Sequence, residues 1–98
     1  MTTGLVAFHY PGPDHRDELV QRMRAAAEVM RTVDGCLDAS VWEVRESEAI
    51  VSTGTFASEE TWSQAVRAVL AAGVDFDYDE RELRPREVYF LEQPECGL

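Results

Sequence analysis

Residues 33–56 carry the sequence VDGCLDASVWEVRESEAIVSTGTF, and this stretch decides the fold. Asp34-Gly35 ends a helical pattern, because glycine accepts the left-handed conformation of a helix cap. Residues 36–45 alternate in polarity and are rich in β-branched side chains, which predicts a strand. Residues 46–48 predict a turn, and residues 49–56 predict a second strand that pairs with the first as a hairpin.

Upstream of this hairpin the sequence predicts a strand followed by a helix. Residues 5–10 form a largely apolar run that Pro11-Gly12-Pro13 ends. Asp14 offers an N-cap for the helix, and Asp17 follows in a position typical of a capping box. The apolar positions of the helix form one wide stripe: Leu19, Val20, Met23, Ala26, Ala27, Met30 and Val33.

Downstream of the hairpin the sequence predicts a second helix and a last strand. Ser58 is the expected N-cap, with acidic residues in the first turn after it. Residues 72–73 end this helix, an acidic connector covers residues 74–84, and residues 87–92 predict the strand. The expected buried stripe of the helix consists of Trp62, Ala65, Val66, Val69 and Leu70.

The order strand, helix, strand, strand, helix, strand predicts an α+β, ferredoxin-like fold. Right-handed crossovers place both helices on one face of a four-stranded antiparallel sheet. The chain has 98 residues, so we expect a single domain over residues 1–98 with a core over about residues 4–92.

The strands carry apolar side chains on both of their faces. In the first strand, Leu5 and Ala7 oppose Val6, Phe8 and Tyr10. Since the helices cover one face only, the other face would expose more apolar surface than a monomer usually tolerates. We therefore expect an obligate homodimer with sheet packed against sheet. The alternation leaves open which face turns toward the helices.

Charge and composition exclude several classes of protein. The formal net charge of −10 repels nucleic acid and anionic membranes. No apolar run reaches the length of a membrane span, and the N-terminus lacks the pattern of a signal peptide, so we expect a cytoplasmic protein. Cys36 and Cys96 do not form a disulfide scaffold or a zinc site. The sequence contains no lysine, which excludes a lysine Schiff base.

The acidic connector is the one stretch that suggests a metal site. Its carboxylates alternate with apolar residues and lack the glycine and the spacing of a calcium-binding loop. We therefore favour an extended edge with its carboxylates in solvent and no metal, paired in part with arginines. The carboxylates are Asp75, Asp77, Asp79, Glu80 and Glu82, and the arginines are Arg81, Arg84 and Arg86.

His9 is the leading candidate for chemistry, because it lies in an apolar strand and its side chain titrates near neutrality, as a general base requires. The alternative is a histidine at the end of a strand that bonds to a backbone carbonyl or a partner subunit. His15, at a helix start, is expected to be exposed.

Aromatic residues are candidates for binding a flat substrate. Trp42, Trp62 and Phe8 could stack on it, and Tyr10 and Tyr78 could donate a hydrogen bond. For each of them, packing in the core or at a dimer interface is the alternative.

Several segments together resemble the antibiotic biosynthesis monooxygenase family, over about residues 4–92. The segments are Phe8-His9-Tyr10-Pro11-Gly12, Val33-Asp34-Gly35-Cys36-Leu37, Val41-Trp42-Glu43-Val44 and Thr55-Phe56-Ala57-Ser58-Glu59-Glu60. The resemblance implies a dimeric α+β barrel with a pocket between sheet and helices in each protomer. It also implies a cofactor-free monooxygenase acting on an aromatic or polyketide-like substrate, with His9 as the candidate base.

The chain departs from the chemistries of the family in three ways. Haem-degrading and quinone-forming members use Asn and Trp in the pocket, and this sequence contains no Asn. Trp62 lies about one helical turn earlier than the corresponding Trp, and no His follows the second helix. These departures keep a second hypothesis open, that of a non-catalytic dimeric module that binds a ligand or serves as an accessory subunit.

Overall fold

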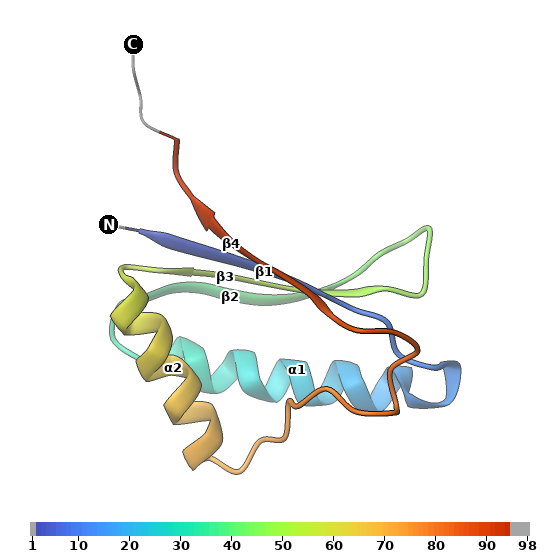
Figure 1. The fold of residues 1–98 in the computed structure, drawn as a ribbon. Helices are drawn as coiled ribbons and strands as arrows, with labels where there is room; N and C mark the ends of the chain where they lie inside the picture. Colours follow the sequence, from blue (N-terminus) through green and yellow to red (C-terminus); the bar gives the residue numbers. More distant parts are fainter. Residues whose placement is uncertain (1, 95–98) are drawn as a thin grey trace.

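The computed structural model describes residues 2–94 and places four strands and two α-helices in two layers (Figure 1). Both helices lie on one side of an antiparallel sheet with the strand order β2-β3-β1-β4, which confirms the predicted ferredoxin-like fold. The elements are β1 (Thr3–His9), the 3-10 turn η1 (Pro13–His15), α1 (Arg16–Arg31), β2 (Cys36–Glu43), β3 (Ile50–Phe56), α2 (Glu59–Ala71) and β4 (Glu87–Glu92).

The burial pattern of β1 shows which face of the sheet the helices cover. Leu5, Ala7 and His9 are buried against the helical layer, whereas Val6 and Phe8 are half-buried on the opposite face. The opposite face also carries Trp42, Tyr89 and Leu91, of which 46–60% is exposed. The structure therefore answers which face of the sheet turns toward the helices, a question that the sequence left open. The face away from the helices carries exposed aromatic and aliphatic side chains.

The start of α1 differs from the prediction. Asp14 lies within η1, and α1 begins at Arg16 with His15 as its N-cap and no side-chain capping bond. The prolines explain the shift, since Pro13 enters the first position of the short 3-10 turn, which uses the residues expected to form the cap. The predicted stripe of α1 is buried from Leu19 to Ala27, and Leu19, Val20 and Met23 pack against Ile50 of β3, whereas Met30 and Val33 are half-buried.

The start of α2 matches the prediction, and its buried stripe differs in part. Ser58 Oγ accepts a hydrogen bond from the backbone N–H of Thr61 at 3.1 Å, as an N-cap does. Ala65 and Val69 are buried as expected, but Leu70 is 57% exposed. The helix is rotated so that its buried row passes through Thr61, Ala65 and Val69, and Leu70 lies beside that row.

A close approach at Gly35 joins the end of α1 to the start of α2. Gly35 has a φ of +94°, and a Cβ atom placed there would lie 2.8 Å from Thr61 Oγ1. The carbonyl of Gly35 accepts a hydrogen bond from the backbone N–H of Ala57 at 2.8 Å. Both the backbone conformation and the absence of a side chain are thus required where the two helices and the hairpin meet.

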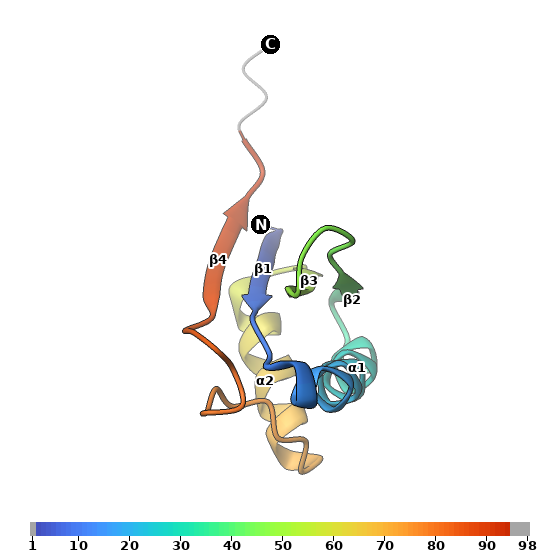
Figure 2. The ribbon, with the colours of Figure 1, turned by 90° about the vertical axis from the view of Figure 1, so that its right-hand side faces the viewer.

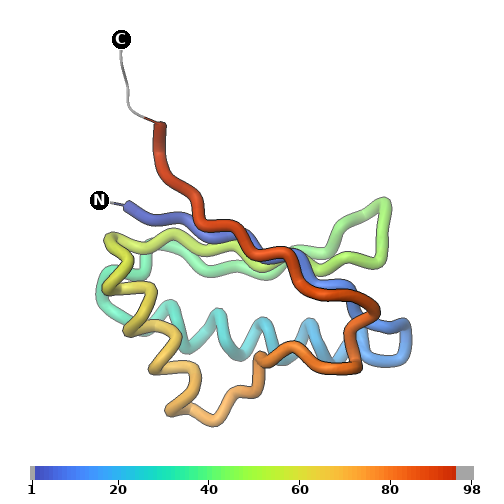
Figure 3. The backbone as a smooth tube through the Cα atoms, viewed as in Figure 1, coloured from blue at the N-terminus to red at the C-terminus, as the bar shows by residue number. Residues whose placement is uncertain are grey.

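The connector between α2 and β4 folds back beneath the sheet on the side of β1 and β4 (Figures 2 and 3). Arg81 binds the carboxylates of Asp75 at 3.1 Å and Asp79 at 2.5 Å, and it also pairs with Glu18 of α1. The guanidinium of Arg81 holds the pKa of Asp79 well below its usual range. These ion pairs attach the connector to α1.

The expectation that every carboxylate of the connector faces solvent was wrong at Glu82. This residue is 5% exposed and pairs with Arg86, because the connector turns inward after Arg81. The backbone N–H of Leu83 donates to the carbonyl of Tyr10, and Pro11 and Glu82 form an isolated β-bridge. Arg84 lies over the ring of Tyr10 instead of pairing with a carboxylate of the connector.

Candidate functional site

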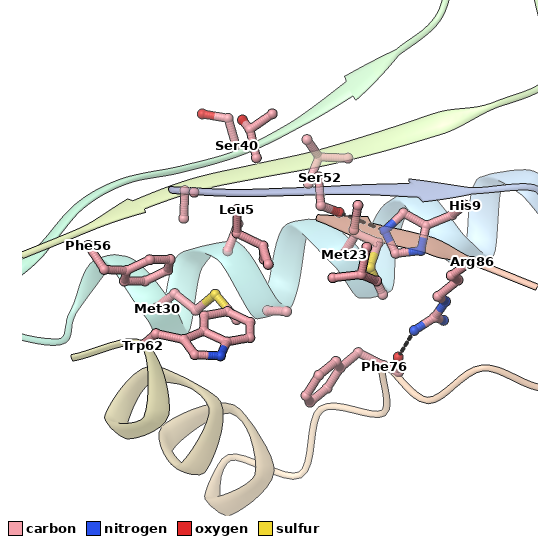
Figure 4. A pocket seen from close by; sticks show the side chains of 18 residues that line it. Leu5, His9, Met23, Met30, Ser40, Ser52, Phe56, Trp62, Phe76 and Arg86 are labelled. Atoms are coloured by element: carbon pink, nitrogen blue, oxygen red, sulfur yellow. Dashed lines mark hydrogen bonds between the residues drawn. The ribbon is translucent and has the colours of Figure 1, made fainter. Parts of the chain in front are cut away.

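A cavity of about 190 Å³ lies between the sheet and the helical layer (Figure 4). Its wall is almost entirely apolar, and it receives side chains from the sheet, from both helices and from the connector. The apolar residues with the largest side chains in the wall are Leu5, Met23, Met30, Val41, Phe56, Trp62, Phe76 and Val88.

Aromatic rings form the end of the cavity nearest α2. Phe56 is fully buried and meets Trp62 edge to face, with 5.4 Å between the ring centroids and an interplanar angle of 63°. Trp62 also meets Phe90 of β4 at 6.0 Å. Edges and faces of aromatic rings bind flat apolar molecules well, so this end of the cavity suits an aromatic ligand.

His9 supplies the polar group at the other end of the cavity. The residue is 3% exposed, and its Nε2 atom lies 2.9 Å from Ser52 Oγ. Its Nδ1 atom has no hydrogen-bond partner and lies 3.8 Å from Glu82 Oε1. The β1–β3 register pairs Ala7 with Ser52 and His9 with Ile50, so His9 and Ser52 project from the same face of the sheet.

A buried ion pair lies directly behind His9. Arg86 Nε lies 2.8 Å from Glu82 Oε2, and Nη2 lies 2.7 Å from the same oxygen. The Arg86 guanidinium also donates to the carbonyls of Phe76 and Asp77 in the connector. Arg86 therefore fixes both Glu82 and the segment that carries Phe76 into the cavity.

The surroundings of His9 keep its imidazole neutral. Burial, followed by the positive charges of Arg86 and Arg22, lowers the pKa of His9 to about 4. A ring with this pKa carries no charge at neutral pH, so the expectation from the sequence that His9 titrates near neutrality is wrong. The neutral ring is a weaker base than a free imidazole, and a substrate anion that forms beside it favours its protonated form.

The structure brings together two of the residues singled out from the sequence. His9 and Trp62 both line the cavity. Phe8 lies on the opposite face of the sheet, where its ring packs against Tyr89 at 6.4 Å between centroids.

The other three candidates from the sequence also lie outside the cavity wall. The hydroxyl of Tyr10 donates to Glu87. The indole N–H of Trp42 donates to Thr53 Oγ1 at 3.1 Å, on the face away from the helices. Tyr78 is 48% exposed on the connector.

Three polar residues of the site, Ser52, Glu82 and Arg86, were not predicted. The strand alternation contained a signal for Ser52, since it is the one polar side chain in the β3 row that lies beside the row of His9, which consists of Ile50, Ser52, Gly54 and Phe56. No comparable signal marked Glu82, because it follows a run of carboxylates that are in solvent.

Metal-binding and membrane-spanning features are absent from residues 2–94. In this part of the chain no three His, Cys, Asp or Glu side chains are grouped so as to hold a metal ion. No helix formed by these residues is long and apolar enough to cross a membrane. Burial raises the pKa of the half-buried Cys36 thiol, and Cys96 lies outside the described residues.

The sequence matches a family model over residues 3–69, and the family is described as antibiotic biosynthesis monooxygenase. None of the curated proteins matches the chain.

Solved structures with the same fold cover nearly the whole chain. Rv0793 from Mycobacterium tuberculosis is 22% identical, with a TM-score of 0.82 and full coverage of both chains. PA3566 from Pseudomonas aeruginosa is 17% identical, with a TM-score of 0.78, and the match covers 95% of this chain and 94% of that one. A protein described as an antibiotic biosynthesis monooxygenase is 12% identical, with a TM-score of 0.73 and coverage of 94% and 98%. At these identities the likeness establishes the shared fold.

Proposed function

This chain belongs to the antibiotic biosynthesis monooxygenase family, and on that premise we propose that it is a small cofactor-free monooxygenase. Its substrate is an aromatic or polyketide-like molecule that binds in the cavity between the sheet and the helices. The observation that carries this proposal is the neutral, buried His9 at the polar end of a cavity whose other end is formed by Phe56 and Trp62.

The proposed reaction needs a base and a dry cavity, and O2 is its co-substrate. His9 receives a proton from an activated O–H or C–H group, which leaves an electron-rich substrate anion. The anion passes an electron to O2, and the resulting pair combines to form a carbon–oxygen bond. The peroxide takes up a proton and loses water, so that a CH2 group and O2 yield a carbonyl group and one H2O. The apolar wall excludes water while the anion exists.

The size of the cavity limits the substrate. About 190 Å³ lies below the range of roughly 300–1,000 Å³ that is usual for pockets holding drug-sized ligands, whereas a cavity of about 150 Å³ accepts benzene. A molecule of one or two rings fits this space better than one of three rings. 1-Naphthol is therefore a suitable first substrate, because its reaction with O2 gives naphthoquinone and one H2O.

We expect the purified protein to convert 1-naphthol to naphthoquinone in air, with one O2 consumed for each quinone formed.

His9→Ala removes the base and is expected to lower kcat by about 10²- to 10⁴-fold. Since the pKa of His9 is about 4, the rate should show no loss of an essential base between pH 8 and pH 5. Quinone absorbance and an oxygen electrode measure both effects.

His15→Ala is the matched control, because the second histidine lies in η1 outside the cavity wall and should leave kcat unchanged. Dihydroxyanthracenone, with three rings, tests the size limit and should react more slowly. A rate no higher than the background for both substrates, or an unchanged kcat in His9→Ala, would contradict the proposed reaction.

A non-catalytic role in ligand binding is the second candidate, and one observation favours it. Ser52 already occupies Nε2 of His9, and Nδ1 is buried and faces Glu82, so neither ring nitrogen is open to a ligand. A binding module would take up 1-naphthol, as titration calorimetry would show, without forming quinone. Calorimetry and the oxygen assay together separate the two roles.

We further propose that two copies of the chain pair through the sheet face that the helices leave uncovered. Trp42, Tyr89 and Leu91 lie on that face and are about half exposed or more. Sedimentation equilibrium at micromolar concentration is expected to give twice the chain mass of 11.0 kDa.

Trp42→Glu should shift this equilibrium toward the monomer, because it places a charge in the proposed interface. Leu70→Glu is the matched control, since Leu70 is 57% exposed on α2, which covers the other face of the sheet, and should leave the mass unchanged. A monomeric mass for the unmodified protein would refute the pairing.

A further inference from the structure

One nitrogen of the His9 ring is in hydrogen-bond contact inside the protein, and the other is buried and faces a carboxylate. Nε2 lies 2.9 Å from Ser52 Oγ, and Nδ1 is turned toward Glu82 Oε1 at 3.8 Å (Figure 4 shows His9, Ser52 and their contact). The ring is 3% exposed, and Nδ1 has no hydrogen-bond partner. A molecule in the cavity therefore cannot bond to a nitrogen of His9 while the contact with Ser52 is in place.

The charges behind the ring determine which nitrogen carries the proton. A neutral imidazole has one N–H and one lone pair. The Glu82 carboxylate is ion-paired with Arg86 and lies on the Nδ1 side. An N–H at Nδ1 is attracted to this carboxylate, whereas a lone pair there would be repelled by it. We infer that the proton of the neutral ring is on Nδ1 and that Nε2 accepts the hydrogen bond from the Ser52 hydroxyl.

With Nε2 of His9 occupied, Ser52 is the polar group with which a ligand in the cavity can form a hydrogen bond. It is half-buried, lines the cavity, and projects from the same face of the sheet as Ala7, which it opposes in the β1–β3 register. Because its hydrogen is donated to His9, its oxygen retains lone pairs that accept a hydrogen bond. The complementary ligand group is a hydroxyl.

We propose that Ser52 relays the substrate proton to His9, that Glu82 is the positioning residue that fixes the His9 tautomer, and that the substrate is a phenol or enol. This inference rests on the proposed function and specifies its first step. The substrate O–H bond breaks as a new O–H bond forms on Ser52, and the original Ser52 O–H bond breaks as an N–H bond forms on His9 Nε2. The products are a substrate oxyanion and an imidazolium, and no electrons are lost or gained in this step.

The tautomer can be measured without any turnover. Nitrogen-15 NMR of the imidazoles at neutral pH should show that the Nδ1 atom of His9 is protonated and that its Nε2 atom is not. The only other histidine, His15, provides an internal reference. Glu82→Gln, which keeps the shape and removes the charge, should give a mixture of the two tautomers. A His9 signal dominated by the Nε2–H tautomer in the unmodified protein would overturn the proposal.

The substrate class can be measured by binding alone. Titration calorimetry should show 1-naphthol binding about 10-fold more tightly than 1-methoxynaphthalene, which lacks the hydroxyl hydrogen. Ser52→Ala should abolish this preference, and Ser52→Thr, which keeps a hydroxyl and suits a strand, should retain it. Equal affinity for the two compounds in the unmodified protein, or no binding of either, would overturn the assignment of Ser52.

Turnover separates the relay from a purely structural role. Ser52→Ala should lower kcat for 1-naphthol by about 10- to 10³-fold, and Ser52→Thr should restore most of it. An unchanged kcat in Ser52→Ala would contradict the relay while leaving His9 as a possible direct base. A protein with the expected tautomer and hydroxyl preference but no turnover would refute the proposed monooxygenase and retain the site as a binder of phenols.

Discussion

Arg86→Met is expected to lower the free energy of unfolding by about 3–5 kcal/mol. The substitution keeps most of the aliphatic stem of Arg86 but leaves Glu82, whose side chain is 1% exposed, as a buried carboxylate without its partner. It also removes the hydrogen bonds that the guanidinium donates to the carbonyls of Phe76 and Asp77. Urea denaturation followed by tryptophan fluorescence measures the loss.

Two further variants show whether the buried charge causes this loss. Arg84→Met removes an exposed arginine two residues earlier, whose guanidinium lies 3.8 Å from the centroid of the Tyr10 ring, and should cost no more than about 1 kcal/mol. Glu82→Gln combined with Arg86→Met removes both charges and should recover part of the stability of the single variant. A double variant no more stable than Arg86→Met would show that lost packing is responsible.

Phe56→Ala is the second large effect, with an expected loss of about 3–5 kcal/mol in the free energy of unfolding. The Phe56 ring is fully buried at the end of β3 and packs edge to face on Trp62. The backbone is built around it, because a Cβ atom at Gly54 would lie 2.8 Å from Phe56 Cε2. Removal of the ring therefore leaves a void that the neighbouring residues cannot close.

Phe90→Ala is the matched control for Phe56→Ala. Phe90 contacts the same Trp62 ring but is 60% exposed, so its loss should cost about 1 kcal/mol or less. Phe56→Ala also enlarges the cavity, and any folded fraction should accept three-ring molecules more readily than the unmodified protein. Equal destabilisation by the two variants in urea denaturation would contradict the assignment of Phe56 to the core.

The fold could be predicted because each element carries its own local signal. The period of the α1 stripe, the Ser58 cap and the hairpin of residues 33–56 depend on neighbours in sequence. The start of α1 was missed because Pro13 favours a 3-10 turn just where Asp14 offered a cap. Leu70 was misplaced because two adjacent apolar residues fit a helical stripe equally well, and only contact with the sheet decides between them.

The site could be predicted only in part, because its polar residues meet through long-range folding. His9 and Trp62 stood out by residue type, as a titratable group in an apolar strand and a large aromatic in a helix. Ser52 lies 43 residues from His9 in sequence. Glu82 becomes buried only because the connector turns back under β1 and β4, and a pattern of alternating acidic residues carries no information about that path.

The two ends of the connector are fastened in different ways. Toward α2, Asp75 and Asp79 are held by Arg81 in ion pairs whose side chains are a quarter to a half exposed. Toward β4, Glu82 and Arg86 are joined in a shielded pair. Dissolved salt weakens contacts of the first kind far more than those of the second. Salt would therefore loosen the Arg81 ion pairs with Asp75 and Asp79 while the Glu82–Arg86 pair and the arrangement around His9 stay intact.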